Sequence, residues 1–328
     1  MKPYEELTTR GKLRRLRSLS LKALEEYDLQ VKRLKFFAVE TNTMFRVDAQ
    51  DGARYLLRIY SDEETTLRDN LAEMFWLNAL KRDTDLNVIE PVARRDGDYI
   101  TVVNAPGVPG ERRCALFKRV PGRCLAHYLT PEKYCQLGQI MAKLHNHAES
   151  LDLPSDIQPK RWDKVFYYPD EPVVYSSEAY GHLFSLEQIV LLDKVIEHAD
   201  RLFEELYADE GGRMLIHGDL HYWNVHVYRG ELYVLDFEDV MLGYPVQDVA
   251  ITFYYGRDRG DYEALCAAFR EGYTSLRRWP VERSGQLETL MAARKAMFIN
   301  YVARVDPNPR EFIEEGCKSL RHFLEAYD

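Results

Sequence analysis

The chain has 328 residues, which is enough for one large or two smaller domains. Hydrophobic residues make up 46% and charged residues 30%, an ordinary composition for a folded protein that excludes a disordered or collagen-like chain. The 44 basic and 53 acidic side chains give a net charge of −9, which argues against a protein that binds the backbone of nucleic acids.

The apolar runs and the cysteines point to a cytoplasmic protein. The sequence contains no run of 18 or more apolar residues, which is the length that a membrane-spanning helix needs. Basic residues interrupt the amino-terminal segment, whereas a signal peptide needs an apolar run there. The five cysteines form no Cys-x-x-Cys pair, which favours reduced thiols over a zinc site or a disulfide framework. We therefore expect no membrane and no nucleic-acid partner, and the sequence leaves the oligomeric state open.

The first third of the chain predicts a mixture of helices and strands. Helices are expected over residues 12–27, with a basic face, and over 65–81, where apolar residues recur at helical spacing. Apolar runs bounded by turn residues predict strands at 31–39, 43–48, 53–60, 98–103 and 112–120.

The remainder of the chain is mainly helical. Thr130 before Pro131 predicts a helix start, and Ser185 with Gln188 predicts a capping box that opens a helix to about residue 207. The last eighty residues predict helices interrupted near 280 and 307. Short strands are expected at 213–216, 225–228 and 231–236. We therefore expect an α+β protein with a sheet-rich lobe over residues 1–118 and a mainly helical lobe over 119–328.

Two polar clusters follow short apolar stretches in the second lobe. The segment His-Gly-Asp-Leu-His-Tyr-Trp-Asn occupies residues 217–224, and Asp-Phe-Glu occupies 236–238. Carboxylate and amide oxygens in this small number suit Mg²⁺ that is held together with substrate phosphates. A further carboxylate that accepts a proton would complete the requirements of phosphoryl transfer.

The pattern His-Gly-Asp-x-x-x-x-Asn, followed twelve residues later by Asp-Phe-Glu, resembles the aminoglycoside phosphotransferase and choline kinase group of small-molecule kinases. The resemblance implies a two-lobed protein-kinase-like fold. A small antiparallel sheet with a helix would form the nucleotide-binding lobe, and a larger, mainly helical lobe would carry catalysis and bind the acceptor. It also implies ATP or GTP as the phosphoryl donor and Mg²⁺ as the cofactor.

The same resemblance assigns roles to residues of the two motifs. Asp219 would be the catalytic base, and His217 would brace the catalytic loop. Asn224 and Asp236 would bind Mg²⁺, and Glu238 would bind a second metal ion through water. Asp248 matches a family aspartate that helps to hold the catalytic loop, and it would also suit the first turn of a helix.

In the amino-terminal lobe, Arg58 stands where the family usually has a phosphate-binding lysine. A guanidinium can bind phosphate oxygens in a two-pronged manner, so the exchange is chemically workable. Glu73 is the candidate ion-pair partner on the following helix, with Glu63, Glu64 and Asp69 as competitors.

The sequence signals for the nucleotide-covering loop and for the adenine site are weaker than those of the two motifs. Thr41, Asn42 and Thr43 take the place of a glycine-rich loop, and these residues would also suit a plain hairpin turn. The carbonyl of Lys118 and the amide of Val120 match the backbone groups that contact adenine in the family.

The acceptor is the least specified part of the prediction. A small hydroxylated molecule is favoured, such as an aminoglycoside, an amino alcohol, a sugar or a hydroxy amino acid. A Ser/Thr protein kinase is an alternative, although Gly218 replaces the usual arginine and little chain separates Asp236 from the next helix. A nucleotide-binding pseudokinase is a further alternative, favoured only by the unusual Arg58.

Aromatic and acidic side chains provide candidates for acceptor contacts. The aromatic residues would form either an apolar wall for a ring or a cationic amine, or part of the core. The aromatic candidates are Tyr167, Tyr168, Tyr222, Trp223, Tyr254 and Tyr255, and the acidic candidates for binding an amine are Asp163, Asp258 and Glu315.

Overall fold

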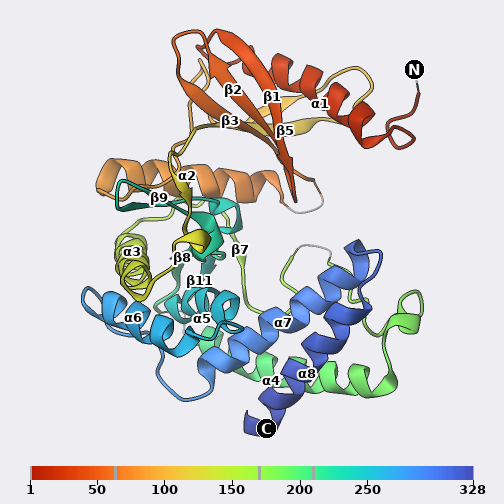
Figure 1. The fold of residues 1–328 in the computed structure, drawn as a ribbon, viewed down its shortest axis with the longest axis vertical. Coiled ribbons are helices and arrows are strands. Elements are labelled where there is room, and N and C mark those ends of the chain that lie inside the picture. Colours follow the sequence, from red (N-terminus) through yellow and green to blue (C-terminus); the bar gives the residue numbers. More distant parts are fainter. Residues whose placement is uncertain (1, 63–64, 169–170, 209–210, 328) are drawn as a thin grey trace. The chain divides into compact units, whose positions relative to one another are not determined.

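A computed structural model describes residues 2–62, 65–168, 171–208 and 211–327 (Figure 1). Contacts within the chain divide it into two units, which are described separately. Unit 1 comprises residues 1–123, 154–158 and 226–238, and unit 2 comprises residues 124–153, 159–225 and 239–328. The division into lobes at residue 118 stays a prediction, and the contacts group the Asp-Phe-Glu segment with unit 1.

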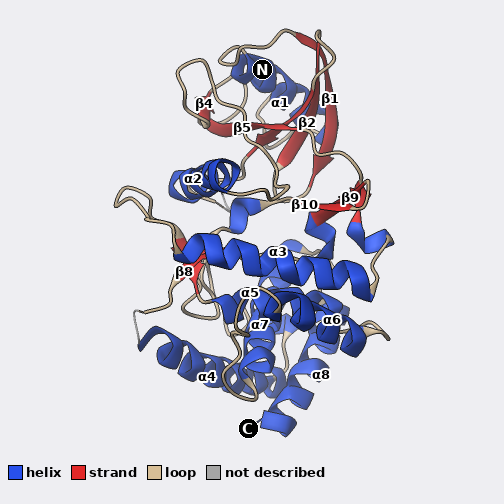
Figure 2. Cartoon of the chain, turned by 90° about the vertical axis from the view of Figure 1, so that its left-hand side faces the viewer, coloured by secondary structure: helices blue, strands red, loops and turns tan. Residues whose placement is uncertain are grey.

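Unit 1 contains most of the long strands (Figure 2). The predicted helices and strands of this region are present, with ends that differ from the predicted ones by up to three residues. The elements are α1 (Thr9–Leu24), β1 (Val31–Val39), β2 (Thr43–Ala49), β3 (Arg54–Ile59), α2 (Leu67–Asp83), β4 (Thr101–Val103), β5 (Arg112–Lys118), β6 (Arg123–Cys124), β9 (Val225–Tyr228) and β10 (Glu231–Val234). The boundary between the units falls within β6 and β9, so Cys124 and Val225 are counted with unit 2.

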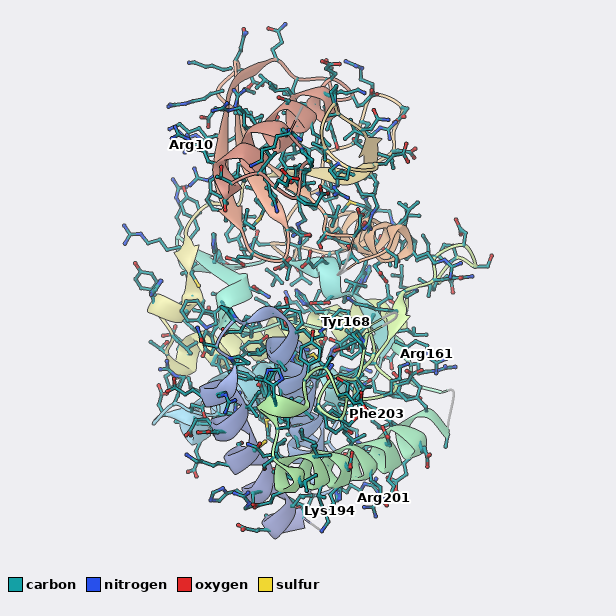
Figure 3. All side chains as sticks on the ribbon, turned by 90° about the vertical axis from the view of Figure 1, so that its right-hand side faces the viewer. Arg10, Arg161, Tyr168, Lys194, Arg201 and Phe203 are labelled. Atoms are coloured by element: carbon teal, nitrogen blue, oxygen red, sulfur yellow. The ribbon has the colours of Figure 1, made fainter. Side chains whose placement is uncertain are left out.

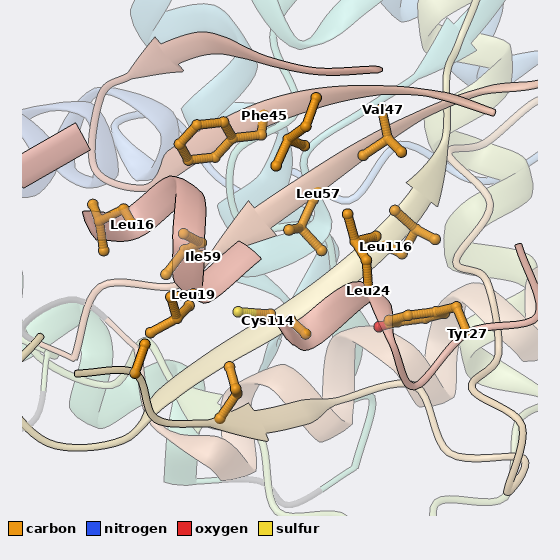
Figure 4. Close-up of a cluster of buried hydrophobic side chains, with 14 of the residues drawn as sticks. Leu16, Leu19, Leu24, Tyr27, Phe45, Val47, Leu57, Ile59, Cys114 and Leu116 are labelled. Carbon is orange, nitrogen blue, oxygen red and sulfur yellow. The ribbon is translucent and has the colours of Figure 1, made fainter. Parts of the chain in front are cut away.

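The main sheet of unit 1 is antiparallel, with the strand order β1-β2-β3-β5-β4. Its register places Arg58 of β3 between Met44 of β2 and Ala115 of β5, in the middle of the sheet. Helix α1 covers the sheet with Leu16, Leu19, Ala23 and Leu24, which recur at helical spacing and are buried. Figure 4 shows this apolar cluster, which fixes the strand that carries Arg58.

Helix α2 begins with a capping box that the sequence spacing did not single out. Thr66 Oγ1 accepts a hydrogen bond from the backbone N–H of Asp69, and the Asp69 carboxylate accepts one from the backbone N–H of Thr66 at 2.8 Å. Asp69 is therefore used as a helix cap. Further along the helix, Trp76 packs edge-on against Phe237, with 5.6 Å between the ring centroids.

Unit 2 is mainly helical and also carries a small three-stranded sheet of order β7-β11-β8. Among the residues that the structure describes, no helix is both long and apolar enough to cross a membrane. The elements are α3 (Pro131–Glu149), β7 (Lys160–Arg161), α4 (Leu186–Ala208), β8 (Met214–Ile216), β11 (Met241–Gly243), α5 (Pro245–Gly256), α6 (Tyr262–Thr274), α7 (Gln286–Val305) and α8 (Arg310–Tyr327).

Local sequence signals explain where two of these helices begin. Thr130 Oγ1 accepts a hydrogen bond from Lys133 N at the start of α3, with Pro131 in the first turn. Ser185 and Gln188 form the predicted capping box before α4, with hydrogen bonds of 2.8 and 3.2 Å. Both helix starts are confirmed.

Small residues bring α3 and α6 together. A Cβ atom on Gly138 would lie 2.1 Å from the carbonyl oxygen of Phe269, and one on Gly272 would lie 1.9 Å from that of Cys135. No other residue type fits at this crossing. The close packing places His145 of α3 against Tyr273 of α6, and both residues support the site described next.

Candidate active site

The predicted site residues fall into one cluster in each unit. In unit 1, the Arg58 cluster consists of Arg58, Glu73, Asp236, Glu238 and Asn42. The guanidinium of Arg58 donates from Nη1 to Glu73 Oε1 at 2.9 Å and from Nη2 to Asp236 Oδ1 at 3.0 Å. Its Nη1 also lies 3.5 Å from Glu238 Oε2. One guanidinium thus joins three carboxylates.

Burial makes these ion pairs electrostatically strong. Arg58 is 4% exposed and Glu73 is fully buried. Burial opposes the charge of Arg58, but the carboxylates of Glu73, Asp236 and Glu238 outweigh that cost and raise its pKa well above its usual value. The hydroxyl of Tyr60 donates to the second oxygen of Glu73 at 2.7 Å, so both oxygens of this carboxylate are used.

The structure brings Glu73, and not Asp69, into contact with Arg58. Asp69 caps α2, as described above. The other two competitors, Glu63 and Glu64, lie outside the described residues.

The loop between β1 and β2 contacts the Asp-Phe-Glu segment. The Asn42 amide donates to a carboxylate oxygen of Glu238, and its own oxygen accepts from the backbone N–H of Ser61 at 3.0 Å. Thr41 Oγ1 donates to Glu238 at 3.3 Å, whereas Thr43 is already the first residue of β2. Thr41 and Asn42 therefore anchor this turn to Glu238, and a role of the turn in covering the nucleotide stays a prediction.

Two backbone features accompany this cluster. Asp236 follows β10 and adopts a left-handed conformation with φ of 59°, which an aspartate tolerates better than a branched residue. Lys118 ends β5, where its backbone N–H donates to the carbonyl of Glu90 at 2.8 Å. The carbonyl of Lys118 and the amide of Val120 therefore lie at and just beyond the end of β5, where the adenine contacts were predicted.

In unit 2, the Asp219 cluster consists of Asp219, His221, Asn224, Tyr255 and Arg294. Asp219 Oδ1 accepts hydrogen bonds from Arg294 Nη2 at 2.5 Å and from the hydroxyl of Tyr255 at 3.1 Å. Its Oδ2 accepts from Asn224 Nδ2 at 2.9 Å and lies 3.1 Å from His221 Nε2. The carboxylate is therefore held from both sides while its side chain keeps 17% exposure.

The charges around Asp219 keep it ionised. Burial alone would raise its pKa, but His221 and Arg294 outweigh burial and lower the pKa well below its usual value. Burial raises the pKa of Tyr255, so its hydroxyl stays protonated and donates to Asp219. The arrangement presents an oriented carboxylate that can accept a hydrogen bond from a hydroxyl group.

Asp248 holds the loop that carries Asp219. Its carboxylate accepts hydrogen bonds from the backbone N–H groups of His217 and Gly218, both at 2.8 Å, and lies 3.1 Å from His145 Nε2. The ring of His217 in turn accepts a hydrogen bond from Asp219 N at 3.3 Å. Asp248 also lies in the first turn of α5. It therefore both holds the catalytic loop and occupies a helix amino terminus, as the two interpretations of the sequence suggested.

Gly218 is required by geometry. Its φ is 77°, and a Cβ atom there would lie 2.2 Å from the carbonyl oxygen of Asp239. The absence of an arginine before Asp219 therefore has a steric reason in this fold.

A chain of polar contacts leads from Arg294 through two tyrosines. Arg294 Nη1 lies 3.5 Å from the hydroxyl of Tyr167, whose ring stacks on Tyr168 with centroids 4.6 Å apart. The hydroxyl of Tyr168, which is labelled in Figure 3, donates to Asp239 at 3.3 Å, and Asp239 pairs with Lys160 at 2.5 Å. These two tyrosines position ionic groups of this chain.

Most of the other acceptor candidates also have partners from this chain. Cationic side chains lie over the rings of Tyr254 and Tyr255, and Tyr222 is buried, whereas Trp223 is 52% exposed. The acidic candidates pair with basic neighbours. These pairs are Asp163 with Arg161 at 3.3 Å, Asp258 with Arg257 at 3.4 Å and Glu315 with Lys318 at 2.5 Å. The rings of Tyr254 and Tyr255 thus already bear cations of this chain.

The sequence interpretation missed Arg294 and gave His221 no role. Arg294 lies 75 residues after Asp219, on a helix without a motif. The available signal was the adjacent pair of cations, Arg294 and Lys295, within the otherwise apolar stretch 291–299.

The predicted metal ligands in each unit carry oxygen atoms of the kind that Mg²⁺ prefers. Asn224 donates from Nδ2 to Asp219, which leaves its amide oxygen for a ligand, and Asp236 and Glu238 contribute hard carboxylate oxygens. Within the described ranges, no three His, Cys, Asp or Glu side chains gather in a way that could hold a metal ion.

Comparisons with known proteins agree with this description. A family model described as the phosphotransferase enzyme family matches residues 34–279. An uncharacterized protein of Synechocystis sp. is 26% identical over 270 residues, which cover 81% of this chain and 72% of that protein.

Two solved structures share the fold. A microcompartment-associated aminopropanol kinase superposes with a TM-score of 0.72 at 21% identity, covering 93% of this chain and 94% of the other. An amicoumacin kinase in complex with AMP-PNP and Ca²⁺ superposes with a TM-score of 0.75 at 16% identity, covering 98% and 97%. The fold is therefore protein-kinase-like, as predicted, and the chain belongs to the phosphotransferase enzyme family.

Proposed function

We propose that this phosphotransferase moves the γ-phosphoryl group of ATP or GTP to a hydroxyl group of a small molecule, with Asp219 as the base. The observation that carries the proposal is the carboxylate of Asp219, which is ionised, partly exposed and held by four side chains. The nucleotide-bound state of the structurally similar amicoumacin kinase supports a nucleotide as the donor.

The residues of this chain have separate tasks in the reaction. The acceptor hydroxyl donates a hydrogen bond to Asp219 and releases its proton to this carboxylate as its oxygen bonds to the γ-phosphorus. The bond from that phosphorus to the bridging oxygen breaks, and the nucleoside diphosphate leaves. Arg58, oriented by Glu73, contacts nucleotide phosphates. Asp236, Glu238 and Asn224 would hold Mg²⁺, which neutralises phosphate charge when bound.

The short connection after the Asp-Phe-Glu segment favours a small acceptor over a protein. Helix α5 begins at Pro245, nine residues after Asp236. This stretch also contains β11, so it leaves no length for a loop that binds a peptide substrate.

Asp219→Asn tests the role of the base. We expect turnover to fall by about 10³-fold or more, while affinity for the Mg²⁺-nucleotide stays near that of the wild type. Asp236→Asn should instead weaken nucleotide affinity in a calorimetric titration. Asp163→Asn, which alters an acidic side chain paired with Arg161, is the control. Near-normal turnover of Asp219→Asn would contradict the proposal.

A further inference from the structure

Two cations converge on one tyrosine of α5. The guanidinium carbon of Arg257 lies 3.8 Å from the ring centroid of Tyr254, and Lys295 Nζ lies 5.6 Å from the same centroid. Lys295 also lies 5.0 Å from the ring centroid of Phe312. We define Arg257, Lys295 and Tyr254 as the Tyr254 basic cluster.

Lys295 is buried without an acidic partner. The residue is 8% exposed, and within the described part of the chain its ammonium faces two aromatic rings and makes neither a hydrogen bond nor an ion pair. Burial, and to a smaller extent the charge of Arg257, lower its pKa to about 8. The nearby acidic group, Asp258, is exposed and pairs with Arg257 at 3.4 Å. The Lys295 ammonium therefore has no ion-pair partner of its own among the described residues, and an anionic ligand group would relieve part of its desolvation.

This cluster adjoins the candidate base. The ring of Tyr254 packs against that of Tyr255 at 5.5 Å between centroids, and the hydroxyl of Tyr255 donates to Asp219 at 3.1 Å. Arg294, which precedes Lys295 on α7, already neutralises the Asp219 carboxylate. A ligand whose hydroxyl group contacts Asp219 therefore has the cations Arg257 and Lys295 beside it, next to Tyr255.

A cationic acceptor finds little to bind here. The ring of Tyr254 already carries Arg257 and Lys295, and the ring of Tyr255 carries Arg294 at 5.7 Å. An ammonium group brought beside these cations would be repelled. A carboxylate would supply the missing counter-charge.

On the basis of the proposed function, we propose that the acceptor is a hydroxy acid, with its hydroxyl group on Asp219 and its carboxylate on the Tyr254 basic cluster. Lys295 and Arg257 are then specificity residues that select an anionic acceptor over an amino alcohol. They take no part in the transfer of the phosphoryl group.

Acceptors that differ only in their head group test this inference. We would compare 4-hydroxybutyrate, 1,4-butanediol and 3-amino-1-propanol, and likewise lactate, 1,2-propanediol and 1-amino-2-propanol. We expect kcat/KM to be at least about tenfold higher for the carboxylate than for the amine in a series.

In Lys295→Met, KM for the carboxylate should rise by about tenfold or more, whereas KM for the nucleotide should not change. Lys295→Arg should keep the preference, and Lys318→Met, at an exposed lysine of α8, is the control.

A binding measurement separates this inference from the proposed function. The side-chain NMR signal of Lys295, assigned by its loss in Lys295→Arg, should shift on titration with 4-hydroxybutyrate and not with 3-amino-1-propanol. Transfer to amines in preference to carboxylates would overturn the inference and leave the proposed function standing. An unshifted Lys295 signal would also overturn it. A shifted signal in a protein that binds no nucleotide would support the anion site and contradict the proposed function.

Discussion

Arg294 of α7 and Asp219 of the catalytic loop form an ion pair of 2.5 Å, although 75 residues separate them in the sequence. Arg294 is almost completely buried, and its charge lies over the rings of Tyr255 and Phe298. The buried cation does two things to the carboxylate at once. It fixes the orientation of Oδ1, and together with His221 it holds the pKa of the carboxyl group well below its usual value.

Replacing Arg294 should therefore change the pH dependence of the reaction. Without this cation the pKa of Asp219 should rise by about 1–3 units, because an opposite charge at this distance stabilises the ionised form by that amount. In Arg294→Met, the acid limb of kcat/KM should move to higher pH, and kcat should fall by about tenfold. The pH–rate profile measures both. Arg304→Met, on the same helix, is the control, and identical acid limbs for the two variants would refute the role of Arg294.

Asp248 should link the stability of the protein to acid pH. Burial raises its pKa, but the hydrogen bond from His145 and the donors of the catalytic loop outweigh burial and lower the pKa below its usual value. A depressed pKa stabilises the fold at pH values above the unfolded pKa of about 3.9, and this stabilisation is lost as the pH falls through the folded value. Urea unfolding between pH 3 and 7 should therefore show a steeper loss at acid pH in the wild type than in Asp248→Asn.

At neutral pH, Asp248→Asn should lower the free energy of unfolding by about 2–4 kcal/mol, because three donors lose their anionic acceptor. Asp261→Asn removes an exposed carboxylate that is paired with Arg259 at 2.8 Å. This control should change the free energy by less than about 1 kcal/mol. Equal effects of the two substitutions would rule out a special role for Asp248.

Glu73→Gln should weaken nucleotide binding through Arg58. The substitution keeps the shape of the side chain but removes the charge that pairs with Arg58 at 2.9 Å. We expect KM for the nucleotide to rise by about tenfold, while KM for the acceptor changes little. Tyr60→Phe removes the other hydrogen bond to Glu73 and keeps the ion pair, so it should cost about 1 kcal/mol of stability and leave KM for the nucleotide nearly unchanged. Equal rises in KM for the two variants would contradict this account.

Much of the fold could be predicted from local sequence signals. The strands from β1 to β3 follow from apolar runs separated by a turn at Asp51-Gly52, and the starts of α3 and α4 follow from Thr130 and from Ser185 with Gln188. These features depend on residues within a few positions of one another. The family could also be predicted, because its motif residues all lie within the single stretch 217–238 and their spacing can be compared directly.

The neighbours of Asp219 could not be predicted in the same way. Arg294 and Tyr255 reach the carboxylate from α7 and α5, and no short-range pattern connects these helices to the catalytic loop. Aromatic residues such as Tyr254 looked suitable for binding an amine because their number and position were known but their neighbours were not. The contacts of Arg257 and Lys295 with the Tyr254 ring change that interpretation.

Gly218→Ala should disrupt the catalytic loop for steric reasons. The new Cβ would lie 2.2 Å from the carbonyl oxygen of Asp239, and φ of 77° is strained for any residue with a side chain. We expect a loss of about 3 kcal/mol or more in the free energy of unfolding, together with a large fall in kcat. Gly230→Ala is the control that measures the cost of the backbone conformation alone, because φ there is 89° and nothing lies within 4 Å of the added Cβ. It should cost only about 1–2 kcal/mol. Similar losses for the two variants in thermal unfolding would exclude the steric explanation.

Lys295→Met should make the protein more stable while it impairs the use of an anionic acceptor. Since burial lowers the pKa of Lys295 to about 8, against about 10.4 in the unfolded chain, the charged form destabilises the fold below pH 8. Partial access of the ammonium to water reduces this cost to about 1–2 kcal/mol, so Tm at pH 7 should rise by about 2–5 °C. The wild type should gain stability as the pH rises from 8 to 10, and the advantage of Lys295→Met should shrink over the same interval. A lower Tm for Lys295→Met at pH 7 would mean that the ring contacts of Lys295 with Tyr254 and Phe312 stabilise the fold by more than its burial costs.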